Sequence, residues 1–466
     1  MQTSPRILLV AYDNAMIINY FPLGLAYIAA ALLKEGYKVD IYNQDISHYP
    51  EEHLTEYLNK NKYDLIGVSV IGGYYQYRKL LRISNAIIKS NNKPFYVIGG
   101  HGPSPDPEFF IKKTKADVVA IGEGETTVIE LIKALLSKKS LSMVKGIAFK
   151  DGDKVIVNER QPLIKDVDSI PFPAYHLFPM EYYRLRIPPW VKKTDFVMRV
   201  LSARGCTFEC NFCYRLDEGS RIRSNESVVE ELKLLKQDYR ITHVSFMDEL
   251  LMVSVKRTLS LCEAIIKANL KITWDCNGRL NFAKPEVLNL MKKAGCIFIN
   301  YGIESMDDEV LKNMKKGLTV SQIIRGVEAT IKSGIIQGLN IIFGNIGDSK
   351  ETLNKGVDFL LKYDDGTQMR TIRPVTPYPG SPLYYYAIEK GLLKDCEDFY
   401  ENKHLNSDLL AVNFTELSDD EFHQSLLDAN IRIIKHYYEK KKVSSIKDAT
   451  DLYLGNNVSF RGFRQV

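Results

Sequence analysis

The chain has 466 residues, which is too long for one ordinary hydrophobic core and predicts two or three domains. It is 45% hydrophobic and 26% charged, a composition typical of a globular protein. Its 62 basic and 57 acidic residues leave a net charge of +5, too even a balance to favour a polyanion, so we expect no nucleic-acid partner. No apolar run reaches the roughly 18 residues that cross a bilayer, and the first residues do not resemble a secretory signal, which predicts a cytoplasmic protein without a membrane span.

Short apolar runs alternate with helical patterns over residues 1–140. Continuous apolar runs of this length are typical of strands that are buried in a parallel sheet. The alternation predicts a doubly wound, Rossmann-like α/β domain, in which ligands bind beyond the carboxyl ends of the strands. We expect strands at 6–12, 38–43, 64–70, 94–100 and 116–125, with helices at 23–36, about 50–60, about 74–90 and in the segment TTVIELIKALLS.

Glycines gather directly after these strands, among them Gly99, Gly100 and Gly122. Glycine allows a backbone to approach a flat or phosphorylated ligand closely. Each glycine taken alone is equally explained by a tight strand-to-helix turn. No G-x-G-x-x-G follows the first strand, so the fingerprint of a dinucleotide-binding domain is absent.

Residues 141–195 change character and predict a hairpin followed by a linker. The stretch 146–159 has a hairpin pattern that turns at Asp151 and Gly152. The stretch 168–179 carries three prolines and several aromatic residues without a clear period, which indicates a packed linker.

A second α/β series follows, and it predicts a partial (βα)6 barrel over residues 196–390. In such barrels the chemistry lies at the carboxyl ends of the strands. From residue 391 to residue 466 the pattern is helical and ends in a polar tail. The strands of the barrel are expected at 196–206, 241–247, 271–275, 296–303, 336–343 and 368–376.

Three of the seven cysteines, Cys206, Cys210 and Cys213, follow the first barrel strand within eight residues. In a reducing compartment such a group indicates metal binding rather than disulfides. A structural zinc site needs four ligands, and the second half of such a motif is missing. Three thiolates instead suit a 4Fe–4S cube that leaves one iron open to another ligand.

The spacing C-x3-C-x2-C after a barrel strand, with the aromatic Phe212 before the third cysteine, resembles the radical S-adenosylmethionine superfamily. The resemblance implies that Cys206, Cys210 and Cys213 bind three irons and that S-adenosylmethionine chelates the fourth. An electron from the cluster would then release a 5′-deoxyadenosyl radical, with an electron donor such as flavodoxin or ferredoxin as a partner.

Polar residues at the other strand ends fit the same resemblance, which implies that they and Phe212 bind S-adenosylmethionine. Asp248 and Glu249 resemble the group that accepts hydrogen bonds from the ammonium of the cofactor. Arg279 would pair with a carboxylate, and Glu304 or Ser305 would meet the ribose hydroxyls. Each residue taken alone is equally explained as a surface charge or a turn.

The first domain resembles the cobalamin-binding domain of cobalamin-dependent radical S-adenosylmethionine enzymes, through FPLGLAYIAAALLKEGYKVDIYN, VIGGHGPS and AIGEGETTVIELI. The resemblance implies that Gly99, Gly100, His101 and Gly122 lie near a corrin. No D-x-H-x-x-G supplies a histidine for the lower face of cobalt, so we expect cobalamin to bind base-off. Two alternatives stay open: His101 caps the next helix, or the domain is a relic that binds no corrin.

The resemblance, which covers residues 5–390, implies a cobalamin-dependent methyltransferase that acts on an unactivated carbon of a small molecule. An alternative enzyme is a radical cyclase, oxidase or dehydratase that transfers no methyl group and need not use cobalamin. A carrier of a corrinoid or of an iron–sulfur cluster is disfavoured, because a carrier does not need residues that grip S-adenosylmethionine.

Cys276 is a candidate catalytic residue, because it directly follows the strand expected at 271–275, at the catalytic rim of the barrel. A thiol there would donate a hydrogen atom to a substrate radical, as a dehydration or reduction needs and a methyl transfer does not. The alternative is a small buried hydrophobic side chain, since free cysteines are often buried.

Overall fold

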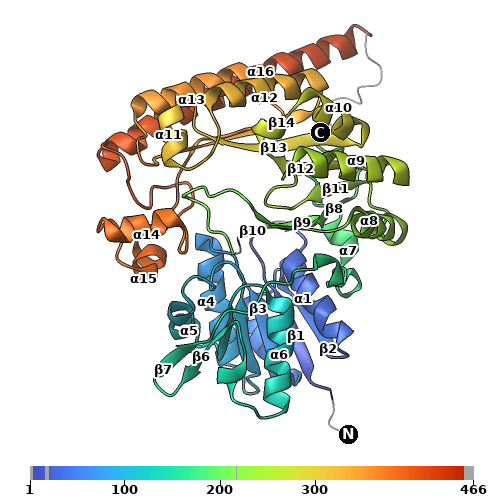
Figure 1. Cartoon of the computed structure of the whole chain (residues 1–466), viewed down its shortest axis with the longest axis vertical. Coiled ribbons are helices and arrows are strands. Elements are labelled where there is room, and N and C mark those ends of the chain that lie inside the picture. Colours follow the sequence, from blue (N-terminus) through green and yellow to red (C-terminus); the bar gives the residue numbers. More distant parts are fainter. Residues whose placement is uncertain (1–3, 16–19, 217, 456–466) are drawn as a thin grey trace.

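The computed structural model describes residues 4–15, 20–216 and 218–455, which form two α/β bodies whose sheets are separate (Figure 1). The first sheet has seven strands in the order β2-β1-β3-β4-β5-β6-β7, of which the first five are parallel. These five are β1 (Arg6–Ala11), β2 (Lys38–Asn43), β3 (Leu65–Ser69), β4 (Phe95–Gly99) and β5 (Val118–Ala120). The five strands expected from the sequence therefore form, in a doubly wound order.

The side chains of these strands alternate between two cores, because successive residues of a strand point to opposite faces of the sheet. On one face they pack against α1 (Leu23–Lys34) and α6 (Gly124–Leu136). On the other face they pack against α3 (Glu51–Lys60), α4 (Tyr74–Ile88) and α5 (Pro107–Thr114). The short helix α2 (Gln44–Ser47) follows β2.

The hairpin expected at 146–159 forms as β6 (Ile147–Asp151) and β7 (Lys154–Val157). It pairs with β5 in antiparallel fashion and so extends the first sheet, although the sequence analysis grouped it with the linker. The linker itself is packed, since the ring centre of Phe21 lies 5.3 Å from that of Tyr175 and 5.1 Å from that of Phe178. The short helices of this region are η1 (Leu141–Met143), η2 (Val167–Ser169), η3 (Tyr175–Leu177) and α7 (Met180–Tyr183).

The second sheet is an open, all-parallel half-barrel of six strands in the order β15-β14-β13-β12-β11-β8. Its strands are β8 (Val197–Val200), β11 (His243–Phe246), β12 (Thr273–Gly278), β13 (Cys296–Glu304), β14 (Ile336–Phe343) and β15 (Arg373–Pro374). The helices that follow them are α8 (Asn225–Tyr239), α9 (Val255–Ala268), η4 (Leu280–Phe282), α10 (Pro285–Lys293), α11 (Asp308–Asn313), α12 (Val320–Ser333) and α13 (Lys350–Tyr363).

Three barrel strands differ from the sequence expectation. The first is interrupted after β8, and the chain continues as β9 (Ala203–Cys206), which pairs with β10 (Gly219–Ile222) instead of the barrel. The third, β12, runs three residues further, to Gly278. The last, β15, has two residues, and the guanidinium of Arg370 donates to the carbonyl of Gln337 at 3.4 Å along the edge of β14 that β15 leaves open.

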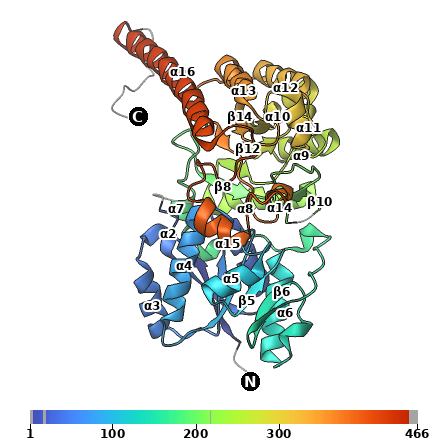
Figure 2. The ribbon, with the colours of Figure 1, turned by 90° about the vertical axis from the view of Figure 1, so that its left-hand side faces the viewer.

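The C-terminal region is helical, with α14 (Pro382–Glu389), α15 (Cys396–Asp398), the π-helical turn η5 (Phe399–Lys403) and α16 (Asp419–Tyr453). Helices α14 and α15 return to the first domain, where Tyr400 stacks on Tyr77 with ring centroids 4.6 Å apart (Figure 2). Helix α16 begins against α13 and extends away from the body (Figure 2). None of the helices in the described part of the chain is long and apolar enough to cross a membrane.

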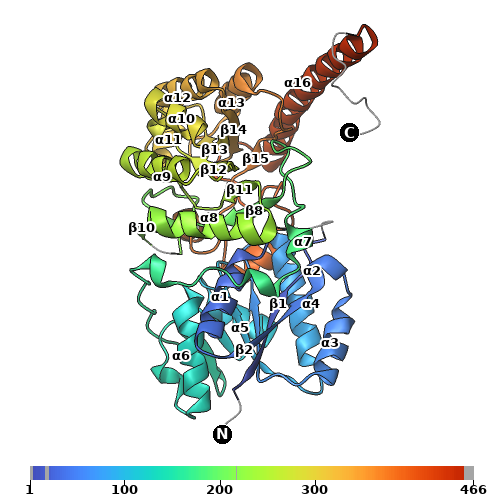
Figure 3. The same cartoon turned by 90° about the vertical axis from the view of Figure 1, so that its right-hand side faces the viewer.

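The two bodies lie one above the other along the long axis, with β9 and β10 between them (Figures 1 and 3). The carboxyl end of β3 and the segments that follow β4, β5, β8 and β11 line one shared cavity. The carboxyl ends of both sheets, where ligands of such sheets bind, therefore face the same space.

Candidate functional site

Two cavities meet between the domains. The interdomain cavity, of about 370 Å³, lies between the carboxyl ends of β3, β4 and β5 and the strand β9. The lumen cavity, of about 450 Å³, lies inside the half-barrel and is lined by Cys206, Cys210 and Cys213. His101 and Glu249 line both cavities, so ligands in the two would be neighbours.

The cysteine loop is held in place by backbone contacts to the far side of the half-barrel. Asn211 donates its backbone N–H to the carbonyl of Met314 at 2.9 Å and its side-chain amide to Asn345 at 3.1 Å. The hydrogen bond between Cys210 and Cys213 lowers the pKa of Cys210 and raises that of Cys213. Among the described residues, no group of three or more acidic, histidine or cysteine side chains is arranged to hold one metal ion. All three thiols nevertheless line one cavity.

The charged residues predicted at the strand ends lie beside this loop. Lys316 forms an ion pair of 2.9 Å with Glu304 and lies 5.9 Å from the ring centre of Phe212. Glu304 has a φ of +70°, a strained conformation for a residue with a side chain and one that is found preferentially at functional sites. Lys316, Glu304 and Phe212 all line the lumen cavity, and binding of S-adenosylmethionine by Phe212 and Glu304 stays a prediction.

Arg279 also lines the lumen cavity and contacts both the cysteine loop and the strand ends. Its guanidinium carbon lies 3.5 Å from the ring centre of Phe208, and one terminal nitrogen donates to the carbonyl of Lys316. Its Nε is buried and has no hydrogen-bond partner. A buried donor without a partner costs free energy, so a bound carboxylate would satisfy this group.

Three asparagines form a chain of amide hydrogen bonds across the lumen cavity. The Asn340 amide donates to Asn300 at 2.8 Å, Asn300 donates to Asn277 at 3.2 Å, and Asn277 donates to the carbonyl of Asp248 at 2.9 Å. This amide chain was not predicted from the sequence. The available signal was one asparagine at a cavity-lining position in each of three neighbouring strands.

Two predicted cofactor residues do not line either cavity. Asp248 is 1% exposed and accepts hydrogen bonds from the backbone N–H groups of Ser202 and Ala203, at 2.6 and 3.0 Å. Asp248 therefore stabilises the interruption between β8 and β9. Glu249 is the carboxylate at the end of β11 that lines both cavities. Ser305 is buried, and its hydroxyl accepts from the backbone N–H of Asp307 at 3.3 Å.

The structure does not bring Cys276 to the lumen cavity. Because β12 continues to Gly278, the alternation of strand side chains directs Asn277 into the lumen and Cys276 to the opposite face. There Cys276 is 2% exposed and belongs to the core with Cys262 and Cys296. Burial raises the pKa of its thiol. The expected position on the catalytic rim is wrong, because it assumed a strand that ends at residue 275.

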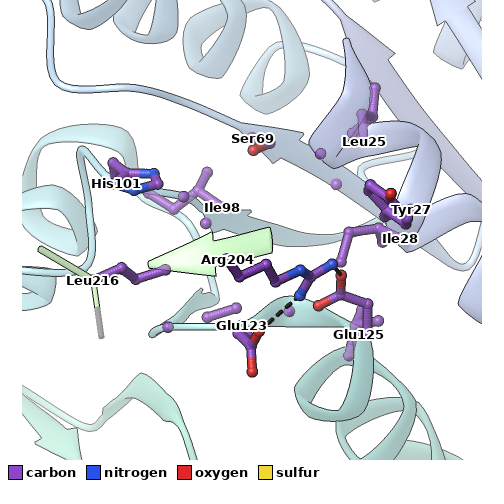
Figure 4. Close-up of a pocket in the computed structure, with 18 of the residues that line it drawn as sticks. Leu25, Tyr27, Ile28, Ser69, Ile98, His101, Glu123, Glu125, Arg204 and Leu216 are labelled. Atoms are coloured by element: carbon purple, nitrogen blue, oxygen red, sulfur yellow. Dashed lines mark hydrogen bonds and ion pairs between the residues drawn. The ribbon is translucent and has the colours of Figure 1, made fainter. Parts of the chain in front are cut away.

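The interdomain cavity continues as an apolar slot between the first sheet and the helices α1 and α6. A Cβ atom on Gly67 would lie 2.8 Å from Leu9 Cδ2, and one on Gly124 would lie 2.7 Å from Ile28 Cδ1, so both glycines keep the slot open. Its labelled lining residues include Leu25 and Ile28 (Figure 4). The apolar walls are formed by Leu9, Leu25, Ile28, Leu65, Val97 and Val128.

The mouth of the slot carries the glycines and the histidine that the sequence singled out. Gly99, Gly100, His101 and Gly122 all line the interdomain cavity. Gly100 has a φ of +102°, and a Cβ there would lie 2.5 Å from the carbonyl oxygen of Val70, so a larger residue does not fit. Burial lowers the pKa of His101 from its ordinary value, which favours the neutral imidazole.

A buried ion-pair network joins the two domains at this cavity (Figure 4). Arg204 of β9 contacts Glu123 at 2.7 Å and Glu125 at 2.5 Å, and Arg221 of β10 contacts Glu123 at 2.8 Å. Burial alone would raise the pKa of Glu123, but hydrogen bonds from Arg221 and Arg204 lower this pKa below its ordinary value. This network was not predicted from the sequence, because its members are far apart along the chain.

Two family models match the chain. The Radical SAM superfamily matches residues 200–360, and the B12 binding domain matches residues 19–132. An uncharacterized methyltransferase of Pyrococcus horikoshii is 32% identical over 377 residues, which are 80% of this chain and 79% of that protein. An anaerobic magnesium-protoporphyrin IX monomethyl ester cyclase of Rubrivivax gelatinosus is 28% identical and covers 82% of this chain and 69% of its own length.

Two solved structures share the fold. The radical S-adenosylmethionine methyltransferase TsrM of Kitasatospora setae, with cobalamin and a [4Fe–4S] cluster bound, matches with a TM-score of 0.70 and 20% identity, over 84% of this chain and 80% of that one. The cobalamin-dependent S-adenosylmethionine radical enzyme OxsB, with aqua-cobalamin and S-adenosylmethionine bound, matches with a TM-score of 0.75 and 20% identity, over 98% of this chain and 73% of that one.

Proposed function

Because the chain belongs to the radical S-adenosylmethionine superfamily, in the branch that carries a cobalamin-binding domain, we propose that it is a cobalamin-dependent methyltransferase that acts on an unactivated carbon of a small molecule. The observation that carries the proposal is the meeting of the two cavities at His101 and Glu249. A substrate at this junction would lie between the two cofactors.

The residues of the lumen cavity fit a 4Fe–4S cluster and S-adenosylmethionine. Cys206, Cys210 and Cys213 would hold three irons, and a cluster bound there would supply the electron for cleavage of S-adenosylmethionine, with flavodoxin or ferredoxin as the proposed electron donor. Arg279 would use its unpartnered Nε to bind the carboxylate, and Glu249 would accept from the ammonium. The amide chain through Asn300 would offer donors and acceptors to the ribose.

The residues of the interdomain cavity fit cobalamin. The cofactor carries a planar aromatic base on its nucleotide tail, and the apolar slot beside Gly67 and Gly124 has the chemistry to receive such a base. Cobalamin held with its base in the slot would be bound base-off, as expected from the sequence, and would supply a methyl group for transfer to carbon. The open slot favours the use of cobalamin over the relic alternative.

A radical cyclase, oxidase or dehydratase is the second candidate, because relatives of this chain include a cyclase. A dehydration or reduction would need a hydrogen-atom donor such as a thiol at the lumen. Cys276, the thiol that the sequence offered for this purpose, lies on the opposite face of β12. Its position therefore favours methyl transfer.

The test uses anaerobically reconstituted protein loaded with the cluster and cobalamin, and S-adenosylmethionine labelled in its methyl group. We expect 5′-deoxyadenosine to form on reduction and the label to appear in the protein-bound corrinoid. Formation of 5′-deoxyadenosine without transfer of label to the corrinoid would favour the second candidate. Absence of both products would contradict both enzyme assignments.

A further inference from the structure

The cysteine loop is carried by a two-stranded ribbon that belongs to neither of the two larger sheets. Strands β9 and β10 pair in antiparallel fashion, and Cys206 at the end of β9 lies opposite Gly219 at the start of β10. The loop between these two residues carries Cys210 and Cys213, so the three thiols lie at the end of the ribbon. A two-stranded hairpin is at best marginally stable by itself, and the position of the loop therefore depends on what holds the ribbon.

One carboxylate of the first domain holds both strands of the ribbon. Arg204 of β9 and Arg221 of β10 lie opposite each other in the register, and both contact Glu123, which immediately precedes α6, at 2.7 and 2.8 Å. Arg204 also contacts Glu125 in the first turn of α6 at 2.5 Å (Figure 4). Like charges directly opposite each other on paired strands are destabilising, so the ribbon needs this carboxylate. We call Glu123, Arg204 and Arg221 the clamp.

The side chains of the clamp are largely shielded from solvent. Those of Glu123, Arg221 and Arg204 are 7%, 14% and 17% exposed, so solvent screens their ion pairs little. The linker also meets the clamp, because the backbone of Ile164 donates to Glu123 at 2.9 Å and accepts from Arg221 at 2.8 Å. Neutralising Glu123 would leave two opposed arginines without the carboxylate that they share.

The clamp lies between the two cofactor cavities. Glu123, Arg204 and Gly205 line the interdomain cavity, and Cys206, the next residue of β9, lines the lumen cavity. A ligand in the interdomain cavity would therefore contact the clamp and exclude water from its ion pairs. Because ion pairs strengthen when water is excluded, such a ligand would hold the ribbon more firmly.

We propose that the clamp positions the cysteine loop from the first domain, so that retention of the cluster depends on Glu123 and increases when cobalamin fills the interdomain cavity. The three residues of the clamp are positioning residues, since they act through the ribbon rather than by touching the cluster. The words cluster and cobalamin rest on the proposed function, whereas the hold of Glu123 on the ribbon does not.

The first test needs no cofactor. Hydrogen–deuterium exchange of the apoprotein, read by mass spectrometry on peptides that cover β9 and β10, compares the unchanged protein with Glu123→Gln. We expect these amides to exchange about tenfold faster in the variant, because hydrogen bonds to a charged group are lost. The matched control is Glu51→Gln, which breaks a 2.5 Å ion pair with Lys79 in the same domain but lines neither cavity. Equal exchange in the two variants overturns the proposal.

The second test measures how firmly the cluster is held. Protein reconstituted with iron and sulfide under anaerobic conditions is mixed with an iron chelator, and the loss of cluster absorbance gives the rate of iron release. We expect release to be about tenfold faster in Glu123→Gln than in Glu51→Gln. Equal release from these two variants contradicts the proposal.

The same assay with added cobalamin tests the coupling between the two cavities. Cobalamin should slow iron release about fivefold in the unchanged protein, a factor at the low end of typical coupling between two sites, and should have little effect in Glu123→Gln. Cobalamin that binds, as seen in its absorption spectrum, without slowing release contradicts the coupling.

Variants of Arg221 separate the effect of charge from that of packing. Arg221→Lys keeps a positive charge that can pair with Glu123, whereas Arg221→Met does not. We expect iron release from Arg221→Lys to be closer to that of the unchanged protein and release from Arg221→Met to be faster. Equal release from the two would contradict a clamp made of ion pairs. If Glu123→Gln does not fold, as judged by circular dichroism, this pair of variants still decides.

The outcomes separate the clamp from the proposed function. A ribbon that loosens in Glu123→Gln, in a protein that forms no 5′-deoxyadenosine or binds no cobalamin, would contradict the proposed function and leave the clamp standing. Transfer of label to the corrinoid, together with equal iron release from Glu123→Gln and Glu51→Gln, would support the proposed function and overturn the clamp.

Discussion

Arg204, which precedes the first cysteine of the cysteine loop by two residues, forms an ion pair of 2.7 Å with Glu123 of the first domain. The ion pair thus links β9, the strand that leads into the cysteine loop, to the N-terminus of α6. Side chains of both partners are largely buried, so the pair is screened little by solvent.

We expect Arg204→Met to destabilise the apoprotein, because it leaves Glu125 without its arginine and Glu123 with one arginine instead of two. Breaking a buried pair from one side costs about 3–5 kcal/mol in the free energy of unfolding. Urea denaturation of the apoprotein measures the change. The control is Arg6→Met, whose exposed pair with Asp40 should contribute less than about 1 kcal/mol. Equal effects of the two changes would contradict a structural role for the network.

Glu123 also predicts a dependence of stability on pH. Its pKa in the folded protein lies below the ordinary value of 4.5, so its charge stabilises the fold above that value. This contribution is lost as the pH falls through the lower, folded-state pKa. The difference in unfolding free energy between the unchanged protein and Glu123→Gln should therefore be largest near neutral pH and shrink below pH 4.5. A difference that grows on acidification would be inconsistent with this assignment.

Narrowing the apolar slot should weaken the binding of cobalamin through its nucleotide tail. In Gly67→Ala the new Cβ would lie 2.8 Å from Leu9 Cδ2 and would push that side chain into the slot. Titration of apoprotein with cobalamin and with cobinamide, which lacks the tail, measures both affinities. We expect weaker binding of cobalamin and little change for cobinamide. Gly356→Ala, where the nearest atom lies at 3.4 Å, is the control.

The cysteines should divide into two groups on replacement. If these three thiolates hold the cube, as proposed, Cys206→Ala, Cys210→Ala or Cys213→Ala should each remove the cluster and all S-adenosylmethionine cleavage. Cys276→Ala should keep the full iron content and cost about 1 kcal/mol of stability, as expected for a small cavity in a packed core. Iron analysis and ultraviolet–visible spectra check both groups. Loss of turnover in Cys276→Ala with cluster and cleavage intact would restore its catalytic role.

The amide chain predicts an effect on the affinity for S-adenosylmethionine. Asn300→Ala removes one acceptor of the Asn340 amide and the donor to Asn277, so the amide chain across the lumen is interrupted. We expect affinity to fall by about tenfold, the equivalent of about one to two hydrogen bonds. Equilibrium dialysis with the reconstituted cluster measures it. Ser305→Ala, beside the same strand but outside the cavity, should have little effect.

The sequence predicts those parts of the site that depend on local order. The spacing of Cys206, Cys210 and Cys213 is a property of one loop, and the structure places all three on one cavity. By contrast, the assignment of Asp248 and Glu249 depends on which of two adjacent carboxylates turns inward. That choice is made by the N–H groups of Ser202 and Ala203, which are 46 and 45 residues away along the chain.

The wrong position predicted for Cys276 and the contacts that were not predicted have the same physical origin. The position of Cys276 follows from where β12 ends, and strand ends are set by pairing with β13 rather than by the residues of β12 alone. The pairing of Arg204 with Glu123 crosses 81 residues, and the contacts of Arg186 and Arg199 with Tyr20 cross more than 160 residues. None of these relationships has a periodic pattern in the sequence.

The return of α14 and α15 to the first domain bears on how the protein is made. Tyr400 packs between Tyr77 and Phe110, so one core of the first domain contains residues that are synthesised after the whole barrel. During translation the first domain emerges early but cannot complete this core until about 400 residues have been joined. A ribosome stalled within the barrel would therefore present a first domain with an uncovered aromatic face, a species that chaperones and proteases recognise.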